Sequence, residues 1–262
     1  MYWIILPNEP LAKLFVIPEC LNRGYGFSSI YNQIPAQKLR GNDRIGTFAR
    51  GSSNERGVIM DHLTILENKS IFIIREAYAK FRNIAMLWSV GKDSTTLLWL
   101  CRKAFFGKIP FPVIHIDTTY KFPEMYRFRD EYAKKLGLEL IIGRNEGQVE
   151  AEMGPTKGSK LDCCNELKTN ALKQTIAKHG FKALLLGIRR DEHGIRAKER
   201  VFSPRDENFK WNYEDQPAEL WDQYKSTTED DNHFRIHPIL HMTELDIWSY
   251  IKRENIPITG LY

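Results

Sequence analysis

The sequence predicts an α/β fold, a doubly wound and mostly parallel sheet, and three observations support this. From Met60 onward, short apolar runs alternate with amphipathic segments of helical period. The run at 111–117 is almost continuously apolar, as in strands buried on both faces of a parallel sheet. Polar segments follow several of these runs, where such sheets bind their ligands.

The first half of this region is predicted to hold three strands and three helices. An apolar stripe at helical spacing begins at Leu63 and ends near Phe81. A later helix has Pro123 in its first turn and stops at Gly137. In order, we expect a helix over 63–81, a strand over 84–88, a helix over 95–106, a strand over 111–117, a helix over 123–136 and a strand over 138–142.

The second half continues the alternation around one long irregular segment. A glycine-bearing loop over 143–161 leads to a helix that ends at Gly180. Residues 191–233 are polar but hold six aromatic side chains, which we interpret as packing anchors of a functional loop; a base-stacking platform is the alternative. The remaining predictions are a helix over 163–179, strands over 183–186 and 235–240, and a helix opened by a capping box of Thr243 and Asp246.

Residues 1–59 differ from the rest of the chain. They show neither a helical nor a strand period and are punctuated by Pro, Gly, Asn and Ser. We therefore expect a weakly ordered N-terminal extension over 1–59, followed by a folded domain over 60–262. A true start at Met60 is the alternative.

The composition argues against several classes of protein. The net charge is +5, and residues 1–59, with seven Lys or Arg against four Asp or Glu, hold +3 of it, so no nucleic-acid surface is expected on the main domain. Four cysteines are too few for a disulfide framework and favour a reducing compartment; Cys101 is expected in the core. Pro7 and Glu9 interrupt the apolar N-terminus, so we expect a cytoplasmic protein without a membrane partner.

The segment Ser89–Ser94 reads Ser-Val-Gly-Lys-Asp-Ser and joins a predicted strand to a predicted helix. The free N–H groups of a first helical turn and the positive end of the helix dipole attract phosphate. The glycine permits a tight turn, the serines offer hydroxyl donors, and the lysine adds positive charge. Residues 117–121 and 187–192 also follow strands, so all three segments are expected to line one nucleotide crevice.

With these motifs in order, the chain resembles the PP-loop ATP pyrophosphatases, the superfamily that includes the PAPS reductases. Within it, the chain is similar to the small subunits of sulfate adenylyltransferase (ATP sulfurylase). The likeness covers about Met60 to Tyr262, and an aliphatic Val90, where many relatives have glycine, is similar to this branch. The matching segments are 87–94, 115–118, 121–122, 189–200, 202–203, 219–221 and 243–248.

The resemblance implies that ATP and sulfate react to give adenylylsulfate and pyrophosphate, with Mg²⁺ as the expected cofactor and no protein-held metal cluster. Because this product contains a high-energy anhydride and the chain has no GxxxxGK[ST] motif, the resemblance also implies a heterodimer with a GTPase large subunit. The implied catalytic residues are Lys92, Arg189 and Arg190. The implied ATP ligands are Ser89, Gly91, Lys92, Asp93, Ser94, Asp117 and Gly187, and the sulfate or pyrophosphate candidates are Arg196, Lys198 and Arg200.

Several of these residues have a second interpretation. Asp93 either steadies the loop or approaches Mg²⁺. Asp117 either holds its loop or meets the adenosine. The cations of 196–200 either line the site or form a salt-bridged helix face with neighbouring glutamates. His115 and His193 are interpreted as a core and a loop histidine, with metal ligation as the alternative.

Two departures from the family pattern bear on function. Cys163 and Cys164 form a vicinal pair where reductases of the superfamily carry iron–sulfur ligands, but no cysteine follows Cys164. We therefore favour the adenylyltransferase and keep a sulfonucleotide reductase and a non-catalytic nucleotide-binding subunit as alternatives. The chain ends at Tyr262, where the small subunits continue, so a short or truncated C-terminal tail is expected.

Overall fold

The computed structural model describes residues 60–154, 159–206, 209–214, 216, 218–225 and 233–262. The predicted N-terminal extension over 1–59 lies outside these residues, as do parts of the predicted loops over 143–161 and 191–233. The described residues all belong to one folded unit, Met60–Tyr262.

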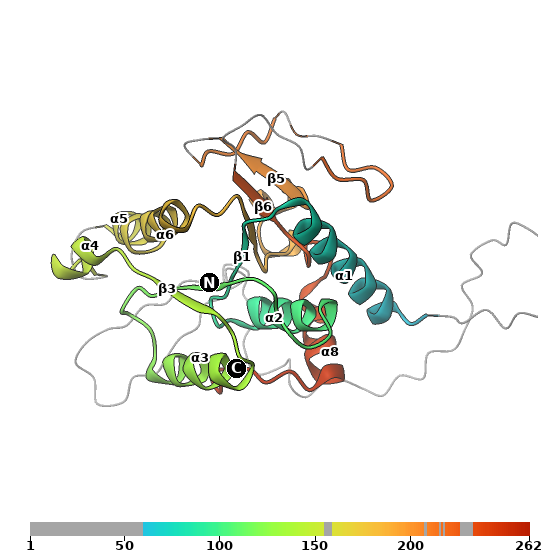
Figure 1. The fold of residues 1–262 in the computed structure, drawn as a ribbon, viewed down its shortest axis with the longest axis horizontal. Helices are drawn as coiled ribbons and strands as arrows, with labels where there is room; N and C mark the ends of the chain where they lie inside the picture. The colour runs from blue at the N-terminus through green and yellow to red at the C-terminus, as the bar shows by residue number, and fades with distance from the viewer. Residues whose placement is uncertain (1–59, 155–158, 207–208, 215, 217, 226–232) are drawn as a thin grey trace, which may run out of the picture. The chain divides into compact units, whose positions relative to one another are not determined.

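A six-stranded sheet with the order β3-β2-β1-β4-β6-β5 forms the centre of this unit (Figure 1). Five strands are parallel, and β5 alone runs antiparallel, beside β6 at the edge. The predicted doubly wound, mostly parallel sheet is therefore confirmed. The strands are β1 (Ile84–Leu87), β2 (Val113–Ile116), β3 (Leu140–Gly143), β4 (Ala183–Leu185), β5 (Phe202–Arg205) and β6 (His233–Ile236).

Helices cover both faces of the sheet (Figure 1), with α1, α2, α3 and α8 on one side and α4 to α6 on the other. A π-helical segment (Asn165–Asn170) joins α5 to α6, and a 3₁₀ turn (Arg190–Glu192) follows β4. The α-helices are α1 (His62–Lys80), α2 (Lys92–Ala104), α3 (Pro123–Lys135), α4 (Glu146–Glu150), α5 (Lys160–Cys164), α6 (Ala171–His179), α7 (Gly194–Ala197) and α8 (Glu244–Glu254).

Local sequence signals explain where the elements begin and end. Thr243 and Asp246 form the predicted capping box of α8. Gly180 ends α6 at φ +67°, a left-handed conformation that glycine adopts without strain. The strands β1 and β4 are buried along their lengths apart from the half-buried Leu87, as expected for central parallel strands, and Cys101 is buried in the core.

Four segments depart most clearly from the prediction. The helix expected from Thr95 begins at Lys92, so half of the loop forms its first turn. The strand expected over 235–240 is shorter and earlier, because residues 237–242 form hydrogen-bonded turns. The predicted loop over 143–161 holds the short helix α4, and the helix expected from Cys163 begins at Lys160.

The antiparallel strand β5 lies within the stretch that the sequence predicted as a loop. Its four residues include a proline, a serine and an arginine, so it has no apolar run to reveal it. Proline is tolerated because β5 is an edge strand. Its pairing with β6 therefore depends on tertiary contacts rather than on a local pattern.

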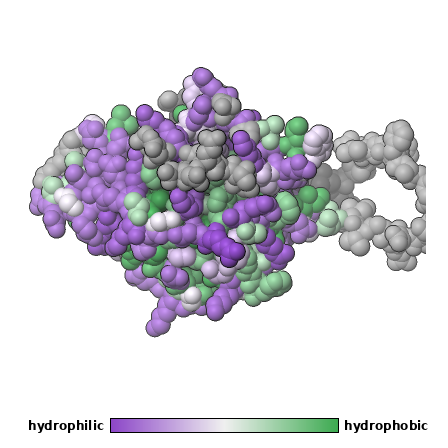
Figure 2. Space-filling model, turned by 45° about the horizontal axis from the view of Figure 1, so that its top comes forward, coloured by the Kyte–Doolittle hydropathy of each residue, from purple (hydrophilic) through white to green (hydrophobic). Residues whose placement is uncertain are grey.

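Within the described residues, no helix is long and apolar enough to cross a membrane. The longest described helix, α1, has 19 residues and includes charged side chains along its length. On the face shown in Figure 2, hydrophilic residues predominate among the coloured atoms, with hydrophobic residues between them.

Candidate nucleotide-binding site

The loops that follow β1 and β4 meet at the point where the strand order of the sheet reverses. In doubly wound sheets this is where ligands bind. The approach is so close that a Cβ added to Gly187 would lie 2.9 Å from both the backbone N and the Cα of Ser94. Only glycine permits this contact, so Gly187 is what lets the two loops approach each other so closely.

The loop after β1 ends in the N-terminus of α2, a helix of 13 residues. Its N-cap is Gly91, which has no side chain to bond the free N–H groups of the first turn. The Ser94 hydroxyl donates to the Gly91 carbonyl at 3.1 Å and lies 3.0 Å from the Ser89 hydroxyl. The turn is therefore ordered by its serines, while its backbone donors face the position suited to an anion.

The backbone N–H of Lys92 donates to the hydroxyl of Tyr262 at 3.1 Å. The ring of Tyr262 also packs edge-on against Trp248 of α8, with 5.6 Å between ring centroids. A phosphate oxygen bound at this helix terminus would take the same donor. Tyr262 is thus a residue of the site that the sequence analysis did not select.

Val90 adopts φ +67° and is buried. A β-branched residue in this left-handed region is strained, and burial of its side chain offsets the cost. Glycine adopts the same backbone conformation without strain.

An ion network joins the loop to β4 and α8. The Lys92 ammonium lies 2.8 Å from Asp93 Oδ2 and 3.1 Å from Glu244 Oε2. Arg189 pairs with the other oxygen of Asp93 and, at 2.5 Å, with Glu244 Oε2. Burial by itself would lower the pKa of Lys92, but Asp93 and Glu244 raise it above its usual value, so the lysine stays charged. Two buried cations therefore share two carboxylates at the helix N-terminus.

Further carboxylates surround Arg189. Its Nε lies 2.9 Å from Asp191, and Glu192 approaches its Nη1 at 3.7 Å. Burial, followed by the charge of Asp93, raises the pKa of Glu192. Carboxylates that repel one another beside a phosphate site suit a magnesium ion, which binds through one or two carboxylates and the phosphates of its substrate. Asp93 and Glu192 are the residues that would hold it.

Asp117 follows β2 and is 1% exposed. Arg144 bonds it at 2.5 and 3.0 Å, Tyr126 at 2.8 Å and the Thr119 N–H at 2.9 Å. Burial favours the neutral acid, yet these donors lower the pKa of Asp117 to about 2. All of these donors belong to neighbouring residues of the protein itself, so the geometry favours the interpretation in which Asp117 holds its loop.

Of the remaining predicted cations, Arg190 and Lys198 lie apart from the network. Arg190 is exposed, and its charge acts on Glu219 and His241 instead. Lys198 stacks its ammonium 4.9 Å from the ring centroid of Tyr213. Arg196 reaches the edge of the network, because its Nε lies 4.0 Å from Glu192.

For Arg200 the structure gives a backbone contact, in which its carbonyl accepts a hydrogen bond from the His237 ring at 2.7 Å. The sequence therefore located Lys92, Asp93, Ser94, Gly187 and Arg189 in one place. It missed Glu244, whose position in the first turn of α8, directly after the capping threonine, was the available signal.

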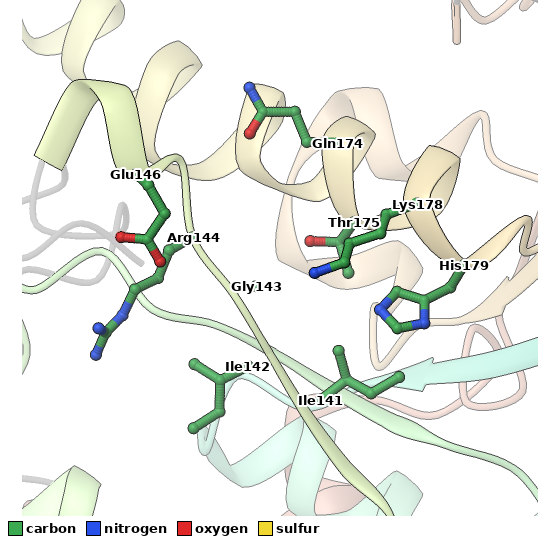
Figure 3. A pocket seen from close by; sticks show the side chains of 9 residues that line it. All are labelled: Ile141, Ile142, Gly143, Arg144, Glu146, Gln174, Thr175, Lys178 and His179. Atoms are coloured by element: carbon green, nitrogen blue, oxygen red, sulfur yellow. The ribbon is translucent and has the colours of Figure 1, made fainter.

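A separate cleft of about 180 Å³ lies between β3, α4 and α6 (Figure 3). Thr175 and Lys178 of α6 extend toward β3 there, and a Cβ on Gly143 would lie 2.3 Å from the Thr175 hydroxyl. None of its lining residues belongs to 89–94, 117–121 or 187–192, so this cleft is distinct from the predicted crevice. Its lining residues are Ile141, Ile142, Gly143, Arg144, Glu146, Gln174, Thr175, Lys178 and His179.

The two vicinal cysteines, Cys163 and Cys164, are half-buried free thiols of α5. Burial raises the pKa of Cys163, and Cys164 adds to that effect. Among the residues that the structure describes, no group of three or more His, Cys, Asp or Glu side chains is placed to hold a metal ion.

Solved structures of two kinds share this fold. A phosphoadenylyl-sulfate (PAPS) reductase from Candida auris, in a phosphate complex, has a TM-score of 0.53 and 17% identity over 80% of this chain and 93% of its own. FMN adenylyltransferase from Candida glabrata in complex with ATP has a TM-score of 0.55 and 20% identity, over 80% of this chain and 62% of its own. At these identities the likeness establishes the fold.

Sequence comparison is more specific. Residues 83–262 match the family model of the phosphoadenosine phosphosulfate reductase domain. Sulfate adenylyltransferase subunit 2 of Saccharophagus degradans is 48% identical over 204 residues, which are 78% of this chain and 67% of that protein. The subunit 2 of Colwellia psychrerythraea is also 48% identical, over 78% of this chain and 68% of its own. The chain therefore belongs to the phosphoadenosine phosphosulfate reductase domain family and, within it, to the family of sulfate adenylyltransferase subunit 2.

Proposed function

We propose that this chain is the ATP-binding and catalytic subunit of a sulfate adenylyltransferase, which converts ATP and sulfate into adenylylsulfate and pyrophosphate. The observation that carries the proposal is that Lys92 and Arg189 both bond Asp93 at the N-terminus of α2, whose N-cap Gly91 has no side chain. Two buried cations held by carboxylates, next to the N–H groups of the first turn of α2, suit the β- and γ-phosphates that leave as pyrophosphate. The 48% identity to proteins named sulfate adenylyltransferase subunit 2 supports the choice of sulfate as the acceptor.

In this proposal the β- and γ-phosphates of ATP lie against the first turn of α2. A sulfate oxygen attacks the α-phosphorus in line, the bond to the α–β bridging oxygen breaks, and its electron pair leaves with pyrophosphate. Nucleotidyl transfer needs positioning and charge neutralisation rather than covalent help from the protein. Lys92 and Arg189 supply the neutralisation, and Ser89 and Ser94 offer hydroxyl donors.

Without ATP, Lys92 and Arg189 are bonded to the carboxylates of Asp93 and Glu244, and the phosphates of ATP must compete with these carboxylates. Glu244 is about half exposed, at 49% of its side chain, whereas Asp93 is largely enclosed at 15%. An incoming phosphate competes with Glu244 for Lys92 and Arg189 more readily than with Asp93. In the proposed mechanism Asp93 therefore keeps both cations in position, and Glu244 yields to the substrate.

Magnesium fits the carboxylates of Asp93 and Glu192, which approach the same guanidinium of Arg189. A bound Mg²⁺ would neutralise charge on the phosphates that leave. The two carboxylates would orient it, and Arg189 would hold both carboxylates toward the helix N-terminus.

The name subunit 2 of the relatives indicates a partner subunit. We propose that this partner is a GTPase, because formation of a high-energy anhydride needs a second source of free energy and the printed sequence has no GxxxxGK[ST] motif. We propose a cytoplasmic location for the complex, where ATP and GTP are supplied.

The test is sulfate-dependent exchange of labelled pyrophosphate into ATP by the chain co-purified with its partner. We expect exchange only when sulfate is present, and a loss of about a hundredfold or more in Lys92→Ala and in Arg189→Ala, because each removes a charge-assisted contact to the leaving group. Arg82→Ala removes an exposed arginine outside the site and is the matched control. Exchange that ignores sulfate, or full activity in Lys92→Ala, would contradict the proposal.

A further inference from the structure

A second cluster of cations lies outside the network at the loop, on the β5–β6 edge of the sheet. The register pairs Ser203 with Arg235 and Arg205 with His233. Because side chains alternate along a strand, these four residues share one face. Phe234, from the opposite face of β6, packs against Phe81 at the end of α1. The cation-bearing face is therefore on the side of the sheet away from α1.

Within this cluster, Arg205 has hydrogen-bond partners for its guanidinium and Arg235 does not. The Arg205 guanidinium donates to Glu199 at 2.8 Å and to the Ser203 hydroxyl at 2.5 Å. The Ser203 hydroxyl in turn donates to Glu199 at 2.8 Å, so both oxygens of this carboxylate are engaged. Among the described residues, the Arg235 guanidinium has no hydrogen bond or ion pair, although it is half-buried. Arg196 adds a third guanidinium, whose charge acts on Arg235.

Two buried imidazoles of this region are incompletely bonded. His233 is 5% exposed, and neither of its ring nitrogens has a partner within the described structure. His237 is fully buried and bonds the Arg200 carbonyl through Nδ1, while its Nε2 has no partner there. Buried polar atoms are nearly always satisfied, so unpartnered ones call for a specific explanation.

The electrostatics of the cluster show a surplus of positive charge. Burial lowers the pKa of Arg205 to about 10, and Arg235 adds to this effect against the opposing charge of Glu199. Burial, followed by the charges of Arg235 and Arg205, lowers the pKa of His233 to about 4. Among the described residues, Glu199 is the one carboxylate within hydrogen-bond distance of the three guanidinium groups, and Glu192 lies 4.0 Å from Arg196. Positive charge therefore exceeds negative charge in this cluster, and burial together with these cations keeps the imidazoles uncharged.

We propose that Arg196, Arg205 and Arg235 form a binding pocket for a tetrahedral oxyanion with two negative charges. Guanidinium groups present planar pairs of N–H donors that match sulfate and phosphoryl oxygens. The guanidinium N–H groups of Arg235 have no acceptor among the described residues, and either ring nitrogen of His233 can supply a further donor. A dianion neutralises the surplus charge and bonds groups that are otherwise unpaired.

The pocket borders the nucleotide site through Glu192. This carboxylate lies 4.0 Å from Arg196 and 3.7 Å from Arg189. Within the proposed function, which this step assumes, the oxyanion is the sulfate that attacks ATP. A phosphoryl group of the bound nucleotide has the same chemistry and is the other source.

The test is calorimetric binding of sodium sulfate to the full chain, with sodium chloride at matched ionic strength as the reference. Arg235→Gln removes the unpaired guanidinium, and Arg82→Gln removes an exposed arginine elsewhere. We expect the sulfate Kd to rise about tenfold or more in Arg235→Gln, because a charge-assisted bond is lost, and to be unchanged in Arg82→Gln. Arg196→Gln, at a more exposed position, provides the same comparison if Arg235→Gln fails to fold.

A non-hydrolysable ATP analogue separates the two sources. If sulfate and the analogue bind to the wild type together, the oxyanion is free sulfate. If the analogue displaces sulfate from the wild type, and Arg235→Gln weakens binding of the analogue as well, a phosphoryl group occupies the pocket. Equal sulfate affinity in wild type and both variants, or no binding beyond that of chloride, would overturn the proposal. Sulfate binding that depends on Arg235 in a protein without pyrophosphate exchange would retain the pocket and refute the adenylyltransferase.

Discussion

Arg189, which follows β4, forms an ion pair at 2.5 Å with Glu244, in the first turn of α8. The same carboxylate oxygen lies 3.1 Å from the Lys92 ammonium. Glu244 thus connects the end of β4, the loop Ser89–Ser94 after β1, and α8. Its half-exposed carboxylate bonds the two cations that, in the proposed function, bind the phosphates of ATP. We therefore expect Glu244 to influence the affinity for ATP.

Glu244→Gln should bind ATP more tightly than the wild type. The substitution removes the negative charge that competes with phosphate for Lys92 and Arg189 while leaving the length of the side chain unchanged. A half-exposed pair is worth about 1 kcal/mol, so we expect a Kd lower by roughly fivefold in calorimetry. Glu124→Gln, on the exposed surface of α3, is the control; an unchanged or weaker affinity in Glu244→Gln would show that Glu244 does not compete with the nucleotide.

Gly187→Ala should destabilise the domain and weaken ATP binding together. The new Cβ would lie 2.9 Å from the Ser94 backbone, and the loops must separate by several tenths of an ångström. We expect a loss of about 1–3 kcal/mol in the free energy of unfolding, measured by urea titration. Gly147→Ala is the matched control, because its Cβ meets nothing within 4 Å. A Gly187→Ala variant as stable as the control would contradict the close packing of these loops.

Tyr262→Phe should increase the affinity for ATP. The Tyr262 hydroxyl accepts the Lys92 N–H at the helix terminus, and its removal frees that donor for phosphate. One neutral hydrogen bond contributes about 1 kcal/mol, so the Kd should fall by roughly fivefold. Tyr78→Phe, on α1, serves as the control for loss of a hydroxyl. Weaker binding in Tyr262→Phe would instead mean that the hydroxyl contacts the nucleotide.

Asp117 should contribute a stability that depends on pH. Its pKa in the folded protein is about 2, below the ordinary value of 3.8, so the folded state favours the carboxylate. The contribution is complete above pH 5 and is lost as the pH falls through 3.8 toward 2. Asp117→Asn should therefore cost roughly 2 kcal/mol at pH 7 and progressively less at lower pH. Urea unfolding of both proteins from pH 7 to pH 3 measures this, and a difference independent of pH would refute the role of the charge.

Much of the local structure was predictable because its causes lie within a few residues. The capping box of Thr243 and the left-handed Gly180 mark helix ends by their own side chains and backbone. The strand β5 was not predictable, because Pro204 and Arg205 form no apolar pattern and the strand exists only through its pairing with β6. Arg189 and Arg190 were equivalent in sequence, yet only Arg189 turns toward the loop.

By itself, the sequence determined the α/β alternation, the phosphate-type loop at Ser89–Ser94 and the family to which the chain belongs. These depend on apolar period and on residues adjacent in the chain. Only the tertiary structure decided that Glu244 pairs with Arg189 and Lys92, and that Arg205 and Arg235 share one face of the β5–β6 edge. Such contacts join residues far apart in the chain, so strand register and helix packing, rather than local preference, determine them.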